Sequence, residues 1–254
     1  MTDPGLRRHY EDKYRDAEGT PPTVVHTDRP RDRFEAAVRT LSGVLPHGAR
    51  VLELAAGDGR VGLALLRERR DLVGYALTDV AETRVGRLGS LRAIDPRITV
   101  RHCDAEQPEL DAGSVDAIVM IALVEHLVDP IRALRRIRDG LAPGGICYLD
   151  TPNIAKWTRR VKLAFGRFPS TASVGEGLVT YEGGPVDLHD EGHLHYFTFG
   201  SLERMLRDSC GFGRVDRVPT LFVLNRAGGV ARRLEDVPTR EALERMVAPA
   251  LPPR

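Results

Sequence analysis

A short apolar run that leads into a glycine-rich turn constrains the fold of this sequence more than any other feature. Residues 51–60 read V-L-E-L-A-A-G-D-G-R. The run at 51–54 is typical of a buried parallel strand, and apolar residues at helical spacing follow the turn. Gly57 and Gly59 can adopt positive φ and let a ligand approach the backbone. This order predicts a ligand site at the carboxyl end of a first parallel strand.

The turn is not a phosphate loop. The sequence lacks the pattern G-x-x-x-x-G-K-S/T that such loops carry. Glu53 lies beside the turn, where its negative charge would repel a phosphate. An acid in this place suits a ligand that carries hydroxyls or an ammonium group.

Strand and helix patterns alternate between residues 49 and 151. Five strands are predicted, at 50–54, 72–78, 98–102, 117–121 and 146–150. Two more are predicted after a helix at 199–209, and they lie at 214–218 and 220–225. Regular alternation of this kind implies a doubly wound sheet with right-handed crossovers. The predicted fold is therefore α/β and Rossmann-like, with seven mostly parallel strands.

Length and composition bound the organisation of the chain. A chain of 254 residues suits one α/β domain with additions. We expect an N-terminal helical cap at 1–48, with a helix at 33–45, and an α/β domain at 49–225. Residues 152–198 break the alternation and are predicted to form a lid or substrate insertion. A tail follows at 226–254.

The charge balance excludes some partners. The net charge is +1, so no overall field favours nucleic acid or a membrane surface. The three cysteines are scattered without metal-ligand spacing, and neither a secretory nor a transmembrane segment is visible. The sequence therefore predicts a cytoplasmic protein with a small-molecule partner, as a monomer or a homodimer.

Six segments carry a resemblance to a known family through their order and spacing. They are E-L-A-A-G-D-G-R at 53–60, C-D-A-E at 103–106, V-D-A-I-V-M-I-A-L-V-E-H-L-V-D-P at 115–130, L-A-P-G-G at 141–145, D-T-P-N at 150–153 and G-H-L-H-Y-F-T at 192–198. Together they resemble class I S-adenosylmethionine-dependent methyltransferases, in the group that includes the ubiquinone-biosynthesis O-methyltransferases and the methionine-biosynthesis W-type proteins. The resemblance covers about 48–225.

The resemblance implies a site for S-adenosylmethionine, with S-adenosylhomocysteine as the product. The implied cofactor-binding residues are Glu53, Ala55, Gly57, Gly59, Asp79, Asp104, Ala105, Ile121 and Ala122. Glu53 would offset the ammonium charge of the methionine part, and Asp79 would bind the ribose hydroxyls. Asp104 would accept a hydrogen bond from the adenine amino group, while Ile121 and Ala122 would line the sulfonium pocket.

Two positions depart from the family pattern. The family often has glycine where this chain has Ala55, and we expect alanine to fit with an ordinary backbone. Asp79 lies two or three residues further from the strand glycine than the family acid does. It is therefore either the ribose ligand or a helix N-cap, in which case Thr78 or a backbone group would serve the ribose.

Histidines supply the candidates for a base. His126 follows the fourth predicted strand, and it either accepts a proton or shapes the cofactor pocket. His193 and His195 belong to the run H-D-E-G-H-L-H at 189–195, where a neutral imidazole could take a substrate proton. The same run offers metal ligands, but its spacing matches no specific metal pattern, and no metal site is predicted. A purely structural role for these histidines is the third alternative.

Aromatic residues supply the candidates for acceptor contact. The predicted set consists of Tyr14, Trp157 and Tyr196, together with one histidine, His189. Residues 157–168 predict an amphipathic helix whose apolar face would cap the substrate site. Its basic residues either favour an acidic substrate or form a solvated face.

The predicted activity is methyl transfer from S-adenosylmethionine to oxygen on a small molecule. Oxygen is preferred because the histidines offer a base and the most similar family members act on hydroxyls. Two alternatives stay open, namely a cofactor-binding partner protein without methyl transfer of its own, and an N- or C-methyltransferase.

Overall fold

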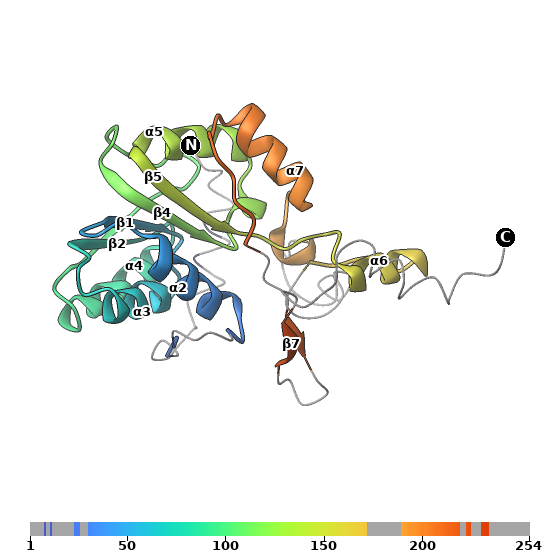
Figure 1. The fold of residues 1–254 in the computed structure, drawn as a ribbon, viewed down its shortest axis with the longest axis horizontal. Coiled ribbons are helices and arrows are strands. Elements are labelled where there is room, and N and C mark those ends of the chain that lie inside the picture. The colour runs from blue at the N-terminus through green and yellow to red at the C-terminus, as the bar shows by residue number, and fades with distance from the viewer. Residues whose placement is uncertain are drawn as a thin grey trace.

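The structure is a computed structural model, and it describes residues 8, 11, 23–25, 30–171, 189–218, 222–224 and 230–233. At its centre lies a five-stranded parallel sheet in the order β3-β2-β1-β4-β5 (Figure 1). Its strands are β1 Arg50–Leu54, β2 Gly74–Asp79, β3 Ile98–His102, β4 Val115–Ile121 and β5 Leu141–Asp150. The strand order reverses beside β1, because the chain returns from β3 at one edge to β4. Open α/β sheets bind ligands at the carboxyl ends of the strands at such a point.

The carboxyl ends of the strands lie level with one another. Asp79, the last residue of β2, pairs with His102, the last residue of β3. Ile121 pairs with Asp150 in the same way at the ends of β4 and β5. Polar residues that follow these strands are therefore brought to one edge of the sheet.

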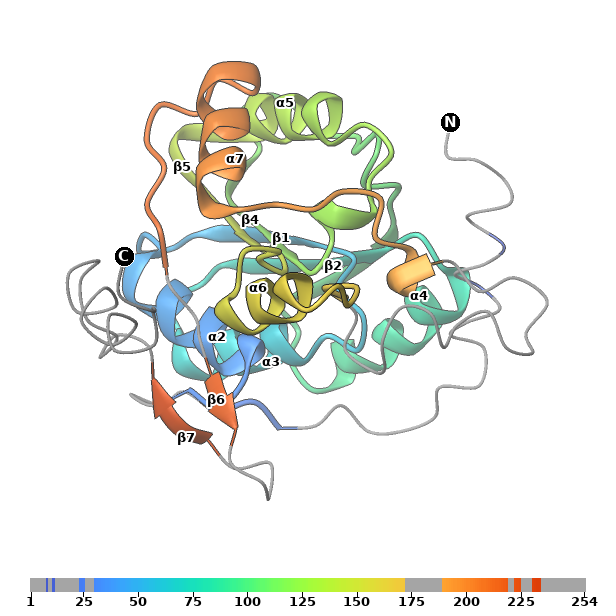
Figure 2. The ribbon, with the colours of Figure 1, turned by 90° about the vertical axis from the view of Figure 1, so that its right-hand side faces the viewer.

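Helices cover both faces of the sheet (Figures 1 and 2). One face carries α2 Arg33–Val44, α3 Arg60–Glu68 and α4 Glu82–Gly89, with the 3-10 turn η1 Ser90–Ala93. The other carries α5 Pro130–Gly140 and α7 Phe199–Arg204, which continues as the π-helical turn η5 Met205–Ser209. Side chains of β1 alternate between the two cores, because successive strand residues point to opposite faces. Val51 packs in the first core, and Leu52 and Leu54 pack in the second.

Local sequence signals explain where α5 begins. The Asp129 side chain accepts a hydrogen bond from the Arg132 N–H at 3.0 Å, and Pro130 occupies the first helical position. Proline suits this position because its missing N–H has no partner within the helix anyway.

The prediction of seven strands is wrong. The sheet has five, and the segment predicted as a strand at 214–218 is irregular. The strand predicted at 220–225 is present as β6 Phe222–Leu224, but it pairs antiparallel with β7 Val230–Arg233 in a separate two-stranded sheet (Figure 2). An apolar run can indicate a strand, but tertiary contacts outside the run determine which strand it pairs with.

The helix predicted in the insertion is present as α6 Trp157–Ala164, but its apolar face is not covered. Trp157 is 58% exposed and Phe165 is 80% exposed. No described core packs against this face, and the expectation that it caps a substrate site stays a prediction. Helical spacing shows which side of a helix is apolar, and it does not show what packs against that side.

Among the residues that the structure places, no helix is both long and apolar enough to span a bilayer.

Candidate functional site

The turn between β1 and α3 uses left-handed backbone at three positions. Ala55, Gly57 and Gly59 have φ angles of 54°, 63° and 74°. A Cβ on Gly59 would lie 2.5 Å from Cδ1 of Leu91, whereas a Cβ on Gly57 would meet only Nη1 of Arg84, at 3.4 Å. Gly59 is thus required for packing and conformation, and Gly57 leaves the turn open to a ligand.

The expectation that Ala55 keeps an ordinary backbone is wrong. Its φ of 54° lies in the left-handed region, where a Cβ clashes with the following carbonyl at a cost of about 1–2 kcal/mol. The fold tolerates this conformation because the flanking strand and turn fix it. The turn thus imposes a backbone conformation that alanine disfavours.

We expect Ala55→Gly to raise the free energy of unfolding by a few tenths of a kcal/mol to about 1 kcal/mol, since relief of the left-handed strain outweighs the added flexibility of the unfolded chain. Urea denaturation measures the change. Ala56→Gly is the matched control, because Ala56 is buried and is not among the residues with positive φ. It should lower stability by about 0.5–1 kcal/mol. Equal losses in the two variants would contradict the assignment of strain to Ala55.

Glu53 is buried beneath the turn rather than exposed on it. Its Oε2 accepts a hydrogen bond from the Tyr75 hydroxyl at 2.9 Å, and the side chain is 4% exposed. Burial raises the pKa of Glu53 to about 8, although the Tyr75 hydrogen bond acts in the opposite direction. The carboxyl group is therefore protonated at neutral pH, and it would have to ionise to offset an ammonium charge.

Asp79 connects the glycine turn to the start of α4. Its Oδ1 accepts from the Ala81 N–H at 3.0 Å, and its Oδ2 accepts from the Gly57 N–H at 3.3 Å. Arg84 Nη1 lies 3.4 Å from the same Oδ2. The N-cap of α4 is Ala81 and the helix has no side-chain cap, so the N-cap alternative for Asp79 is wrong. Its buried carboxylate contacts the turn that a ligand would approach, and its role as ribose ligand stays a prediction.

The remaining cofactor candidates follow β3 and β4. The N–H of Cys103 donates to the Asp79 carbonyl at 3.0 Å, which holds Asp104 and Ala105 next to the end of β2. Asp104 Oδ1 accepts from the Glu106 N–H at 3.0 Å. Ala122 follows β4 with a φ of 49°. Residues from four loops are therefore gathered at the carboxyl edge of the sheet.

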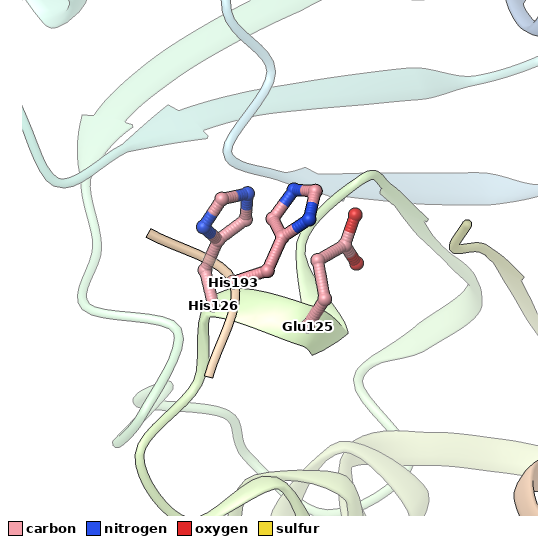
Figure 3. A group of neighbouring side chains, drawn as sticks. All are labelled: Glu125, His126 and His193. Carbon is pink, nitrogen blue, oxygen red and sulfur yellow. The ribbon is translucent and has the colours of Figure 1, made fainter. Parts of the chain in front are cut away.

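Three side chains form what we term the acid–imidazole cluster, namely Glu125, His126 and His193 (Figure 3). One potential ligand atom from each lies within 4.8 Å of those of the other two. The two imidazole rings meet edge to face, with their centroids 4.7 Å apart. Glu125 and His126 come from the 3-10 turn η2 Val124–His126 after β4, and His193 directly follows a second such turn, η4 His189–Gly192.

Backbone hydrogen bonds hold the two segments together. The Glu125 carbonyl accepts from the N–H groups of Leu194 and His195, at 2.8 and 3.1 Å. Nδ1 of His126 lies 3.1 Å from the Gly192 carbonyl oxygen. A carbonyl can only accept, so Nδ1 of His126 carries a proton, and in the neutral ring Nε2 carries the lone pair.

His193 is oriented by a buried chain of hydrogen bonds. Its Nδ1 lies 2.6 Å from Thr171 Oγ1, which lies 2.5 Å from Asp190 Oδ2. The carboxylate must accept from the hydroxyl, so the hydroxyl accepts from Nδ1–H of His193. Asp190 is fully buried and has a φ of 53°. Like His126, His193 thus keeps its lone pair on Nε2.

Glu125 is the least satisfied member of the cluster. It is 1% exposed, and neither carboxylate oxygen makes a hydrogen bond within the described part of the chain. Burial is the main reason that its pKa is raised, to about 7. The Glu125 backbone, the neighbouring Thr151 side chain and Arg33, at the start of α2, act against it, whereas Asp150 acts in the same direction as burial. A buried carboxylate without hydrogen bonds is costly and is uncommon in folded proteins.

Arg159 braces the segment that carries Thr171. This residue lies in α6, and its Nη1 donates to the Asn153 carbonyl at 2.7 Å. Its Nε donates to the Ser170 carbonyl at 2.8 Å. One guanidinium therefore joins the chain before α6 to the chain after it.

The other predicted site residues lie outside the cluster. His195 is not part of it, and its buried Nε2 makes no hydrogen bond among the described residues. The Tyr196 hydroxyl interacts with Asp190, and burial together with that carboxylate raises the pKa of Tyr196 to about 12. Trp157 is exposed on α6. Tyr14 and the side chain of His189 fall outside the described residues.

Glu125 and Thr171 were missed as site residues. Glu125 was visible in the sequence as the acid before His126, directly after the fourth strand. Thr171 carried no local signal, since its role depends on a contact 22 residues along the chain.

Comparison with known proteins shows which sequences this chain resembles. A family model described as a methyltransferase domain matches residues 26–212. A ubiquinone biosynthesis O-methyltransferase from Xanthomonas campestris is 34% identical over 142 residues, which cover 54% of this chain and 55% of the relative. An uncharacterized methyltransferase from Mycobacterium tuberculosis is 39% identical over 116 residues, 45% of each chain. The chain thus spans about half the length of the curated relatives it matches.

Solved structures share the fold at low sequence identity. A chain in the complex between the Haloferax volcanii Trm112 methyltransferase activator and the putative methyltransferase has a TM-score of 0.53 at 16% identity, covering 84% of this chain and 83% of that one. The CurJ carbon methyltransferase has a TM-score of 0.51 at 19% identity, covering 76% and 50%. At these identities the likeness concerns the fold alone.

Proposed function

The chain belongs to the methyltransferase domain family, as a class I S-adenosylmethionine-dependent methyltransferase, and on that premise we propose that it methylates oxygen on a small hydroxyl-bearing molecule. The observation that carries the proposal is the acid–imidazole cluster beside the end of β4. It places two oriented imidazoles and a carboxyl group next to the loops that the family uses for its cofactor. The name of the Xanthomonas relatives supports oxygen as the methyl acceptor.

The donor side would be held by the carboxyl edge of the sheet. S-adenosylmethionine, when bound, supplies a methyl group activated by the positive charge on sulfur. The open side of Gly57 fits a ligand that approaches the turn closely, and Asp79 lies in contact with that turn. We assign the methionine part to Glu53, Ala55, Gly57 and Gly59, the ribose to Asp79, the adenine to Asp104 and Ala105, and the sulfonium to Ile121 and Ala122.

The acceptor side would be formed by the segments around the cluster. Methyl transfer is an in-line displacement, so the protein must align the two reactants and exclude water. A hydroxyl acceptor must also lose its proton, and the cluster provides groups for that step. We propose that His126, His193 and His195 serve proton removal. We propose further that residues 152–198 supply acceptor contacts, with Trp157, His189 and Tyr196 among them, and that Tyr14 adds another.

Methyl transfer is tested with a panel of hydroxyl, amine and carbon acceptors. S-adenosylhomocysteine formation gives the rate, and mass spectrometry with NMR locates the added methyl group. Methylation at oxygen is the expected result. Transfer to nitrogen or carbon alone would contradict the choice of oxygen. Tight cofactor binding with no transfer to any acceptor would instead favour a partner protein that binds the cofactor without using it.

Cofactor binding is tested separately by calorimetry with S-adenosylhomocysteine. We expect Asp79→Asn to weaken binding at least about 10-fold, or roughly 1.4 kcal/mol, because it removes the charge that would hold the ribose hydroxyls. Asp116→Asn is the matched control. Asp116 lies near the start of β4, at the opposite edge of the sheet, and accepts from the Arg50 N–H at 2.8 Å. Equal affinities in the two variants would contradict the ribose assignment.

A further inference from the structure

We propose that Glu125, His126 and His193 bind one divalent transition-metal ion. The binding itself depends only on the cluster, whereas the use of the ion in catalysis rests on the proposed function. Two neutral imidazoles and one carboxylate are a donor set that first-row transition metals favour in proteins. Magnesium and calcium prefer oxygen ligands and suit this set less well.

The spacing of the three groups suits a shared ion. Their potential ligand atoms lie within 4.8 Å of one another. Ligands at about 2.1 Å from one tetrahedral ion lie roughly 3.4 Å apart. The remaining closure needs rotation about the terminal torsion of Glu125, which is broad and soft, and small ring shifts that keep the Nδ1 hydrogen bonds of the histidines. The carbonyl of Glu125 already holds the partner segment beside it through two hydrogen bonds.

The hydrogen bonds behind the histidines match those of metal ligands. A metal-bound histidine usually donates its second ring N–H to a carbonyl or a carboxylate, which fixes both the tautomer and the ring orientation. His126 donates from Nδ1 to the Gly192 carbonyl. His193 donates from Nδ1 to Thr171, and Thr171 donates in turn to Asp190. Both Nε2 atoms therefore carry the lone pair that a cation requires.

Glu125 provides the independent observation that a ligand belongs here. Its carboxyl group is 1% exposed, lies in the cluster shown in Figure 3, and makes no hydrogen bond from either oxygen among the described residues. Burial of such a group without a partner costs free energy that a bound cation would offset. A structural role would instead be expected to give the carboxyl group hydrogen-bond donors, as Asp190 has in Ser170 and Thr171.

The ion would serve the proposed reaction by holding the acceptor. Three protein ligands leave coordination positions open, and a hydroxyl oxygen of the acceptor would occupy one of them. A metal-bound hydroxyl has a lowered pKa and releases its proton to water, so the oxygen meets the methyl donor as an anion. In this arrangement His126 and His193 would serve proton removal through the ion, as its ligands, and His195 would stay outside the metal site.

The test is metal binding by the full chain, purified without a histidine tag and dialysed against a chelator. Titration with cobalt(II) is followed by visible absorption, and titration with zinc(II) by calorimetry. We expect one equivalent of each ion to bind. Glu125→Gln and His193→Gln should each weaken binding at least about 10-fold. His47→Gln removes an exposed histidine outside the cluster and should leave binding unchanged.

A further variant distinguishes the loss of a metal ligand from misfolding of Glu125→Gln or His193→Gln. Thr171→Val keeps the shape of Thr171 but removes the hydroxyl that orients His193, and it should weaken metal binding about 10- to 100-fold. No uptake by the wild type, or wild-type affinity in Glu125→Gln and Thr171→Val, would overturn the proposal. S-adenosylhomocysteine binding is measured on the same samples. Cofactor binding without metal would refute the metal site alone, and metal binding without cofactor would refute the proposed function alone.

Discussion

Gly59→Ala is expected to lower the free energy of unfolding by about 2–5 kcal/mol, because the new methyl group meets two penalties together. The residue has a φ of 74°, which strains any L side chain. The methyl group would also lie 2.5 Å from Leu91 and 3.0 Å from Leu88, which pack against the turn in the first core. Urea denaturation followed by circular dichroism measures the loss.

Gly57→Ala is the matched control for this prediction. Its φ of 63° carries the same conformational strain, but the nearest atom to the new methyl group is the far end of Arg84, at 3.4 Å. We expect a loss of only about 1–2 kcal/mol. If the two variants were equally destabilised, strain alone would account for both, and the packing requirement at Gly59 would be refuted.

Glu53→Gln is expected to remove a large part of the pH dependence of stability between about pH 5 and pH 8. The pKa of Glu53 is about 8 in the folded protein and starts from an ordinary value of 4.5. Between these values the folded state holds a proton that the unfolded state has lost. Stability therefore falls as the pH rises, by up to about 1.4 kcal/mol per pH unit and roughly 5 kcal/mol in total.

Urea denaturation at pH 5, 6, 7 and 8 measures this slope. The difference between wild type and Glu53→Gln isolates the contribution of Glu53 from those of other titrating groups. Glu35→Gln is the control, since Glu35 is also buried but pairs with Arg31, which holds its pKa below the ordinary value. That variant should lose stability at every pH in the range without a change of slope. A wild-type slope in Glu53→Gln would show that Glu53 is ionised in the folded protein.

The sheet could be predicted from the sequence because each strand carries its own signal. The strand predicted at 98–102 is β3 Ile98–His102, and the first strand also agrees at both ends. Of the two strands predicted after residue 210, the one at 214–218 is irregular, and the one at 220–225 is β6 but pairs outside the main sheet. Local signals therefore determine where a strand lies better than they determine its partners.

The candidate site could be predicted only where it follows directly from a strand end. Asp79 and His126 could be proposed because Asp79 ends β2 and His126 follows β4 in chain order. The pairing of Glu125 with the segment at 192–195 was not predictable, since it depends on backbone N–H groups that every residue but proline carries. The conformation of Ala55 was mispredicted for a related reason, because the turn imposes a left-handed backbone that the residue type disfavours.

The hydrogen bonds of Arg159 hold together the two ends of the segment between Asn153 and Ser170. Both ends of the segment are fastened to one side chain, so its outer part can change in length or composition without moving its base. Arg159 also donates from Nη2 to the Thr171 carbonyl at 3.4 Å, so the residue that orients His193 is itself held by the brace. We therefore expect substitutions on the exposed surface of α6 to leave the orientation of His193 unchanged.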